Sequence, residues 1–374
     1  MKLVFWASAA VIAYAYVGYA LLLWMRSWWS PRPVMRGIDT PSVSAVMVVR
    51  NEEGAIGPKL RNLLSLDYPR EQFEVVVVSD GSNDGTAAVV SEFQNNDARV
   101  RIISKPEARG KAAGLNDGIA TARGEVLLFT DARQPIEPKA LRLLIENFSD
   151  PEVGAASGEL MLGDPAGGET GRGMGLYWRI EKKIRELESA SGSVAGATGA
   201  IYCARRGLLD SLPEGTILDD VLLPMQVVRR GSRVIFDARA RAWDSPDLGS
   251  SREFARKVRT LSGNYQLLQL APWLLSSQNA IRFEFISHKL FRLVVPFALL
   301  ALLVASLFLR APFYRLALFA QLAFYALSLA AIGGMKIGPL SRIADPARTF
   351  VVLNSAAMVA FVNFVTGRKA VWIR

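Results

Sequence analysis

Long apolar segments at both ends of the chain constrain its fold most strongly. Residues Leu3 to Met25 are almost uninterruptedly apolar, and further apolar stretches occupy 293–309, 316–334 and 350–365. A helix needs about 20 such residues to cross a bilayer, so we predict one N-terminal span and two to three C-terminal spans. Only the middle of the chain, from 42 to about 247, has the composition of a folded soluble domain.

The first segment has the features of an uncleaved anchor, residues 1–26, rather than of a secretion signal. Its apolar run exceeds the usual ~7–15 residues, and RSWWSPRP follows it where a signal would have a small-residue cleavage site. Three tryptophans then lie at headgroup level, and three arginines place the next domain in the cytoplasm by the positive-inside rule: Trp24, Trp28, Trp29, Arg26, Arg32 and Arg36. A fourth span would leave the basic tail (Arg368, Lys369 and Arg374) outside, so either one C-terminal segment lies in the interface or the tail departs from this rule.

Single residues and net charge exclude several function classes. Cys203, the one cysteine, allows no intramolecular disulfide and no thiolate metal cluster. The one histidine, His288, lies just before an apolar stretch, and we interpret it as an interfacial polar residue rather than a catalytic one. The net charge of +10 is not accompanied by a basic motif with interleaved aromatic residues, so we predict no nucleic-acid partner. Anionic lipid headgroups and a phosphorylated substrate account for this charge.

The middle region alternates between strands and helices. Its valine-rich runs have the length of strands and are VSAVMVV (43–49), FEVVVVSD (73–80), VRIIS (100–104) and EVLLFTD (125–131). Such alternation predicts an α/β fold with a mainly parallel sheet and helices on both faces. Ligands of such folds bind at the carboxyl ends of the strands.

Polar residues follow each of these strands. One crevice therefore collects the side chains of Asn51, Glu52, Asp80, Asp84, Lys111, Asp131 and Arg133. No G-x-G-x-x-G motif follows the first strand, which argues against a nicotinamide enzyme. Each polar segment also has a purely structural interpretation, since Asp84 or Thr86 can cap a helix and the glutamates of NEEG can be ordinary first-turn carboxylates.

Four motifs resemble, in order and spacing, those of the family 2 glycosyltransferases: VVRNEEGAI, VVVVSDGSNDGT, GKAAGLNDGIATARGEVLLFTDA and LDDVLLPMQVVRRG. The resemblance covers roughly residues 42–270, and the apolar ends are similar to the membrane branch that includes synthases of cellulose, hyaluronan and poly-N-acetylglucosamine. It implies a GT-A fold and an inverting hexosyl- or N-acetylhexosaminyltransferase. We divide the chain into the anchor 1–26, a GT-A domain 40–250, amphipathic or interfacial helices 251–290 and C-terminal spans 291–367.

The resemblance also assigns donor-binding roles by position. Asn51 and Glu52 stand where the family contacts the nucleoside. Asp80 stands where the family recognises the base, and Lys111 stands beside the base and the diphosphate. The donor implied is a nucleotide-diphosphate sugar, and a UDP-sugar is the first expectation.

The remaining motifs imply the metal and the base. Asp131 matches the first aspartate of the metal-binding DxD motif, which implies Mg²⁺ or Mn²⁺, and Asp220 matches the catalytic base of the family's ED motif. Arg259 is the one residue kept from the QxxRW motif. Two departures stand out: Arg133 replaces the second DxD carboxylate, and Thr260 replaces the tryptophan on which the synthases seat an acceptor sugar.

The chemistry of glycosyl transfer fits these groups. One general base without a covalent nucleophile gives inversion, and Asp220 is the candidate, whereas Asp219 has the simpler interpretation of a helix-end carboxylate. Magnesium can be held by one protein carboxylate plus substrate phosphates, so Asp131 suffices as a ligand. Arg133 then grips phosphate oxygens beside the metal or, alternatively, turns outward to pair with Glu137.

Two segments after the domain complete the prediction. Arg252, Arg256 and Arg259 share one helical face, and for Arg259 we favour contact with the diphosphate, but for Arg252 contact with solvent or lipid. The stretch LLQLAPWLL, 267–275, is too short to span a bilayer and is interpreted as an interfacial helix that seats the crevice on the membrane.

These observations predict a multi-pass cell-membrane enzyme with a cytoplasmic catalytic domain that builds envelope glycan or glycolipid. Its predicted partners are the sugar donor, a glycan or lipid acceptor, the bilayer, and envelope glycan assembly or export proteins. A single-transfer glycolipid synthase, favoured by Thr260, is the alternative within this class. The alternative from another class is a catalytically silent nucleotide-sugar-binding scaffold, favoured by Arg133.

Overall fold

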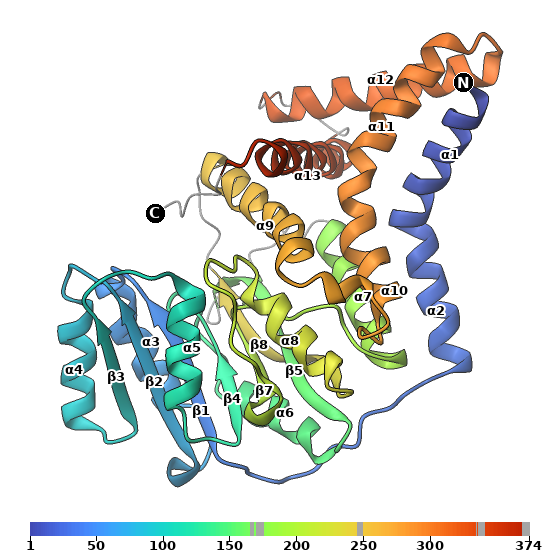
Figure 1. Ribbon diagram of the computed structural model, residues 1–374. Coiled ribbons are helices and arrows are strands. Elements are labelled where there is room, and N and C mark those ends of the chain that lie inside the picture. The colour runs from blue at the N-terminus through green and yellow to red at the C-terminus, as the bar shows by residue number, and fades with distance from the viewer. Residues whose placement is uncertain (165–167, 170–175, 245–249, 334, 336–340, 369–374) are drawn as a thin grey trace.

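A computed structural model of the chain describes residues 1–164, 168–169, 176–244, 250–333, 335 and 341–368 (Figure 1). Arg252 lies in this part with its backbone only, and Lys369 and Arg374 lie outside it, so the expectations made for these three residues stay predictions.

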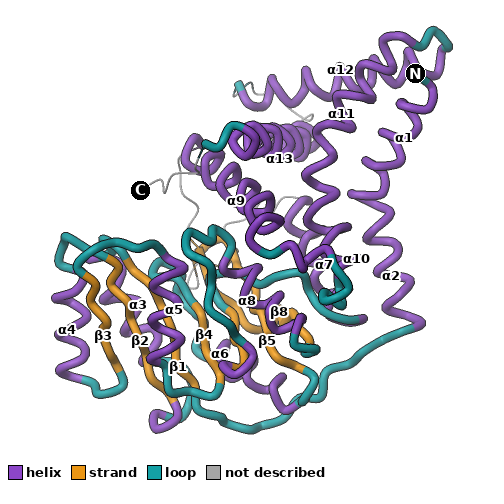
Figure 2. Tube along the Cα trace, viewed as in Figure 1, coloured by secondary structure: helices purple, strands orange, loops and turns teal. Residues whose placement is uncertain are grey.

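The centre of the catalytic region is a mixed, mostly parallel sheet with the strand order β3-β2-β1-β4-β7-β5-β6, and β8 pairs with β5 (Figure 2). Strands β1 to β4 are mutually parallel, β7 is antiparallel to β4 and β5, and β8 is parallel to β5. The strands are β1 (Val43–Val49), β2 (Phe73–Asp80), β3 (Val100–Lys105), β4 (Val126–Phe129), β5 (Val153–Asp164), β6 (Gly168–Glu169), β7 (Tyr202–Arg205) and β8 (Arg233–Asp244). The predicted α/β class and all four predicted strands are confirmed.

Helices cover both faces of this sheet. They are α3 (Glu53–Leu64), α4 (Thr86–Asn96), α5 (Lys111–Thr121), α6 (Ala140–Ile145), α7 (Leu176–Ser191) and α8 (Asp219–Arg229). Alternate residues of β1 point to opposite cores, since Ala45 and Met47 pack with α3, α4 and α6, whereas Val46 packs with α5 and α8. The valine-rich sequence of the central strands follows from this burial on both faces, because Val75 to Val78 of β2 are fully buried.

Among the residues that the structure describes, four helices are long and apolar enough to cross a membrane: Lys2–Trp29, Arg282–Phe308, Pro312–Ile332 and Ile343–Val365. The first consists of α1 (Lys2–Ala13), a π-helical turn (Tyr14–Gly18) and α2 (Tyr19–Trp29). The others contain α10 (Arg282–Phe285), a second π-helical turn (Ile286–Leu290), α11 (Phe291–Phe308), α12 (Pro312–Ile332) and α13 (Ser341–Val365). In Figure 1, α1 runs beside α11, and the contacts between the two helices agree with this view.

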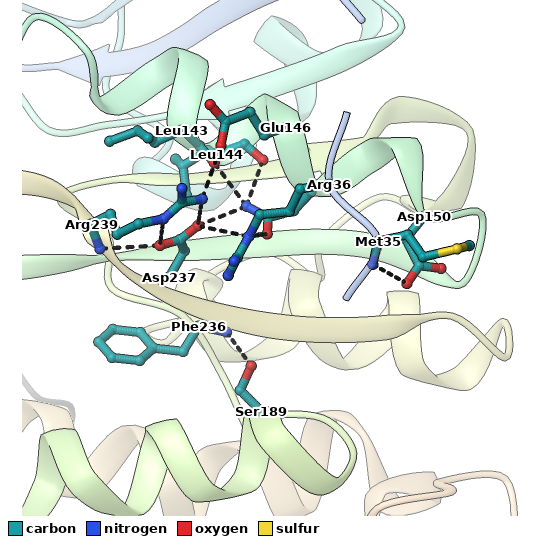
Figure 3. Close-up of polar contacts among 11 residues, drawn as sticks. Met35, Arg36, Leu143, Leu144, Glu146, Asp150, Ser189, Phe236, Asp237 and Arg239 are labelled. Atoms are coloured by element: carbon teal, nitrogen blue, oxygen red, sulfur yellow. Dashed lines mark hydrogen bonds and ion pairs between the residues drawn. The ribbon is translucent and has the colours of Figure 1, made fainter. Parts of the chain in front are cut away.

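The extended segment after the first membrane helix is fixed to the catalytic domain. Met35 N donates to Asp150 Oδ2 (3.2 Å), and Arg36 Nε donates to Asn147 Oδ1 (3.1 Å) and lies 4.0 Å from Asp237 Oδ2 (Figure 3). Asp237 is buried and also accepts hydrogen bonds from Arg239. These contacts restrict how the domain can turn relative to the anchor.

A buried polar junction joins the anchor, α7 and the base of α11. His288 Nδ1 lies 2.8 Å from Glu188 Oε1, and its Nε2 lies 2.9 Å from Glu181 Oε1. Tyr19 donates to Glu188 (2.7 Å), and Arg292 donates to Glu181 (2.6 Å). The interpretation of His288 as an interfacial polar residue was therefore wrong in one respect: the side chain is buried between helices and holds two carboxylates.

The region after the sheet differs from the prediction. Residues 267–270 are the end of the long helix α9 (Ser250–Leu270), and Pro272–Leu275 form a 3₁₀ turn. Leu267, Ala271 and Leu274 are buried in the same core as α5 and α8, and only Leu275 of this stretch's leucines is largely exposed. The apolar residues of LLQLAPWLL thus serve mainly to dock α9 on the catalytic domain.

Candidate active site

The loops after β1 and β2 are tied together at the carboxyl edge of the sheet. Asn51 adopts a left-handed backbone conformation with φ of 55°. Its N–H donates to Ser82 Oγ (3.2 Å), and its side-chain oxygen accepts from Asn83 N (3.0 Å). Asp84 accepts from Thr86 N (3.0 Å) at the start of α4, so the capping interpretation of this aspartate also holds.

Asp80 is buried at the end of β2 and holds the loop that leads into α5. Its two carboxylate oxygens accept hydrogen bonds from Arg109 N and Gly110 N, both at 2.8 Å. Gly110 has φ of +93°, a conformation that a residue with a Cβ rarely adopts. This arrangement presents Lys111, the next residue, at the N-terminus of α5.

Lys111 lies between two carboxylates from different elements. Its Nζ is 3.0 Å from Asp131 Oδ1 after β4 and 3.2 Å from Asp219 Oδ2 at the start of α8. Burial acts to lower the pKa of Lys111, but the charges of Asp131, Asp219 and Asp220 outweigh it and hold the pKa above its ordinary range. The lysine therefore carries a positive charge at neutral pH.

Asp220 follows in the first turn of α8, with its backbone oxygen accepting from Ala197 N (2.7 Å). Burial and the neighbouring charge of Asp219 raise the pKa of the Asp220 carboxyl to about 6, against the opposing effect of Lys111. A carboxylate with this pKa is ionised at pH 7 and is a stronger base than an ordinary aspartate, as general-base catalysis requires.

Gly199 marks the space that these groups share. A Cβ built on this glycine would lie 3.4 Å from Asp131 Oδ2, 3.6 Å from Asp220 Oδ2 and 3.8 Å from Lys111 Nζ. The absent side chain thus leaves room between the proposed base, the proposed metal ligand and the lysine. The sequence analysis missed this residue, although the small-residue run GSVAGATGA carried a signal of close approach.

Two side chains lie where the sequence analysis did not place them. Arg133 pairs with Glu52, with NH2 3.0 Å from Glu52 Oε1, and the alternative partner, Glu137, instead accepts from the Trp243 indole (3.0 Å). Asp219 begins α8, as its helix-end interpretation predicts, but it is also a buried partner of Lys111.

Helix α9 packs against the segment that precedes Asp220. A Cβ at Gly263 would lie 2.6 Å from Leu218 Cγ, and Gln266 Oε1 accepts from Ile217 N (2.9 Å). This packing against the segment before Asp220 explains why a glycine is needed there. Arg259, one turn earlier, is partly buried, whereas Thr260 is exposed.

The carboxylates fit a metal that is held mainly by substrate. The described residues contain no group of three or more His, Cys, Asp or Glu side chains able to hold an ion. Asp131 is 41% exposed, and its Oδ2 faces the space beside Gly199. A hard ion such as Mg²⁺ needs only one or two carboxylates when phosphates complete its shell, so Asp131 with a diphosphate suffices.

Part of this region is similar to a known protein family. Residues 44–212 match the family described as Glycosyl transferase family 2. The chain is 26% identical over 195 residues to the Beta-monoglucosyldiacylglycerol synthase of Synechocystis sp. (strain ATCC 27184 / PCC 6803 / Kazusa), covering 51% of this chain and 41% of that protein. It is 25% identical over 236 residues to the Poly-beta-1,6-N-acetyl-D-glucosamine synthase of Staphylococcus epidermidis, covering 62% and 56%. The chain thus spans about half the length of these relatives.

A solved structure shares the whole fold. The mannosyltransferase PcManGT from Pyrobaculum calidifontis, in complex with GDP-Man and Mn²⁺, superposes with a TM-score of 0.73 at 22% identity. The match covers 98% of this chain and 100% of that one, so the arrangement of catalytic domain and apolar helices is common to both.

Proposed function

We propose, from the premise that this chain is a glycosyltransferase with a family 2 domain at residues 44–212, that it moves a sugar from a nucleotide-diphosphate donor to a hydroxyl of a lipid or glycan. The reaction would take place with inversion at the cytoplasmic face of the cell membrane. The observation that carries the proposal is the convergence of Asp220, Asp131 and Lys111 on the space beside Gly199.

Asp220 would act as the general base. Its carboxylate would accept the proton of the acceptor hydroxyl while that oxygen attacks the anomeric carbon from the face opposite the diphosphate. Because no carboxylate is needed as a nucleophile, one displacement results and the anomeric configuration inverts. The raised pKa of Asp220 improves its basicity while leaving it ionised at pH 7.

The leaving diphosphate would meet positive charge from the chain itself. Lys111 lies at the start of α5 and Arg133 lies on the loop after β4, and both are cationic at neutral pH. Mg²⁺ or Mn²⁺, when bound by Asp131 and the diphosphate, would supply Lewis-acid stabilisation of the leaving group. Asn51, Glu52 and Asp80 would organise the nucleoside end of the crevice, Asp80 through the loop that it holds.

The acceptor is proposed to receive one or a few sugars. Thr260 is exposed on α9 and offers no aromatic face on which a growing sugar chain could stack. The relative from Synechocystis is named as a glucosyldiacylglycerol synthase, which supports a lipid acceptor, whereas the staphylococcal relative supports a polymer. The ring-stacking argument leads us to favour the lipid.

A panel of radiolabelled UDP- and GDP-sugars, incubated with native membranes that contain the protein, tests the proposal. We expect one donor, a UDP-sugar first, to label material that extracts into organic solvent, and we expect membranes with the Asp220→Asn variant to label none. A GDP-mannose signal would change the donor but keep the reaction class. Absence of Asp220-dependent labelling from every donor would refute the proposed function.

A further inference from the structure

A lysine amine is buried beneath the loop that carries Asp131 and Arg133. Lys59, in the middle of α3, is only 2% exposed. Its Nζ donates to Thr130 Oγ1 (2.8 Å) and to the backbone oxygen of Gln134 (2.5 Å). Burial of such an amine costs free energy, so we expect a lysine at an otherwise core-facing position to have a specific role.

The two acceptors of Lys59 stand at the two ends of a three-residue loop. Thr130 precedes Asp131 and Gln134 follows Arg133, so one ammonium group closes the loop from below. Only these two side chains and Ala132 lie between the fixed ends. The loop is therefore held in shape from beneath by a buried amine.

Polar bonds add to the packing of Ala132 in holding this loop against α3. A cavity of about 220 Å³ lies between the loop and the helix, lined in part by Lys59, Asn62, Ala132 and Arg133. Further along the chain, Asn62 fixes Ile136 through two hydrogen bonds of 2.8 Å. The bonds from Lys59 tie both ends of the loop to α3.

The same amine is linked to the opposite wall of the site. Thr130 Oγ1, which accepts from Lys59, donates to the backbone oxygen of Ala200 (2.8 Å). Ala200 follows Gly199, whose Cα faces Asp131 and Asp220. A single chain of hydrogen bonds, from Lys59 through Thr130 to Ala200, thus fixes the distance between two parts of the site. One is the loop that presents Asp131, and the other is the segment just before β7 that borders the proposed base.

We propose that Lys59 is a positioning residue that sets Asp131 and Arg133 for the donor diphosphate. The inference rests on the proposed function, because the diphosphate is the group that Asp131 and Arg133 would share. Lys59 places its charge behind the loop that carries Asp131 and Arg133. Against the larger effect of burial, the charge of Asp131 acts on the Lys59 amine to raise its pKa. Lys59 thus fixes the loop on which Arg133 occupies the second DxD position.

The state of the amine agrees with this role. Burial lowers the pKa of Lys59 to about 7, and the charge of Asp131 acts in the opposite direction. Added negative charge at the site, such as that of a diphosphate, favours the charged form of the amine, so donor binding would strengthen the hydrogen bonds that hold the loop.

Lys59→Met is the decisive variant, because methionine keeps the length and removes the charge and both hydrogen bonds. We expect kcat to fall by about 10- to 100-fold, as for a misplaced reactive group, and UDP to bind more weakly. UMP should bind as before, since the first phosphate and nucleoside do not depend on this loop. Lys59→Arg, which has room in the adjoining cavity, should recover most of the lost kcat.

The controls separate positioning from folding. Asn62→Ala removes hydrogen bonds from the same helix to the same region without removing charge, and it should keep kcat within about threefold. The unfolding temperature of every variant shows whether that variant folds. Thr130→Val breaks the same chain of hydrogen bonds in a second way. A Lys59→Met enzyme with wild-type kcat and UDP affinity overturns the inference, as does an Arg variant that folds but is no better than Met. Wild-type membranes that transfer no sugar at all would instead refute the proposed function, and the inference with it.

Discussion

Arg133 and Glu52 form a bidentate ion pair, with the guanidinium Nε 3.1 Å from each carboxylate oxygen. The pair connects the loop after β4 with the loop after β1, across the edge where the nucleotide is proposed to bind. Arg133 is 69% exposed and Glu52 is 21% exposed. An exposed pair of this kind is worth little in stability, so a diphosphate with two charged oxygens can take over the guanidinium.

Replacing Arg133 by Gln should therefore weaken UDP binding by about tenfold, the value of one charge-assisted contact in a solvated site. Glu52→Gln releases the guanidinium but alters the nucleoside end of the crevice, so it should weaken UMP binding more than UDP binding. Isothermal titration calorimetry with UDP and UMP measures both effects. Equal affinity of wild type and Arg133→Gln for UDP would show that the arginine does not contact the diphosphate.

The sequence predicted the elements of this edge but not its internal pairing. Strands β1 to β4 were predictable because valine-rich runs end in polar turn residues, and their parallel order brings those turns together. Which arginine meets which carboxylate depends on side-chain directions that no periodicity carries. Arg133 was expected to meet either phosphate or Glu137, yet it meets Glu52, which lies 81 residues earlier.

Metal removal should abolish transfer. Asp131 is the one carboxylate of the DxD position, and an ion that it shares with the diphosphate would be held weakly enough for EDTA to remove. We expect full recovery on adding Mn²⁺ or Mg²⁺, measured as initial rate in the native membrane. Arg133→Asp, which restores the usual motif, should lower the metal concentration needed for half-maximal rate. Undiminished activity in EDTA would mean that Lys111 and Arg133 together replace the ion.

Thr260 should limit the product to one or a few added sugars. The residue is exposed on α9 and has no ring on which an acceptor sugar could stack. Mass spectrometry of the product made by purified protein in detergent gives the distribution of chain lengths directly. Long polymers from the protein alone would contradict this prediction, whereas longer products from Thr260→Trp than from wild type would support it.

Buried charges were the part of the site least accessible from sequence. Lys59, Asp219 and His288 each lie in segments whose pattern is satisfied by a simpler interpretation, namely a core helix, a helix start or a membrane boundary. Their partners come from distant segments, as in the hydrogen bond from Lys59 to Thr130. A charge that is neutralised only by tertiary contact leaves no local signature, so the structure was needed to find it.

The rate should rise with pH through about 6. Asp220 must be ionised to accept a proton, and its pKa is raised to about 6 by burial and by Asp219.

The same shift in the pKa of Asp220 has a consequence for stability. Its pKa is higher in the folded than in the unfolded chain, so the folded state binds the proton more tightly, and the associated stability is lost as pH rises from about 4 to about 6. The pH dependence of kcat and of the unfolding temperature measures the two effects. A flat rate profile between pH 5 and 7 would argue against Asp220 as the base.

Asp220→Asn should separate catalysis from binding. The change keeps the size of the side chain and removes the proton acceptor, so kcat should fall by ~10²–10⁴-fold, the usual contribution of a general base. UDP affinity should change little, because the diphosphate is proposed to contact Lys111, Arg133 and the metal instead. The variant should also unfold at a higher temperature than wild type at pH 7.5, since it no longer holds a partly buried charge there.

Asp219→Asn should show the opposite pattern, although the two residues are adjacent. Asp219 accepts from Lys111 at 3.2 Å, so its loss leaves the lysine with Asp131 as its nearest carboxylate and shifts its amine. We expect weaker UDP binding as the larger effect, with kcat reduced less than in Asp220→Asn. Asp210→Asn, at an exposed ion pair with Arg230, is the matched control and should match wild type in both measurements. If Asp219→Asn is the variant that loses kcat at unchanged UDP affinity while Asp220→Asn stays active, the base is Asp219. In that case the remaining role of the Asp220 carboxylate would be to balance the positive charge of Lys111.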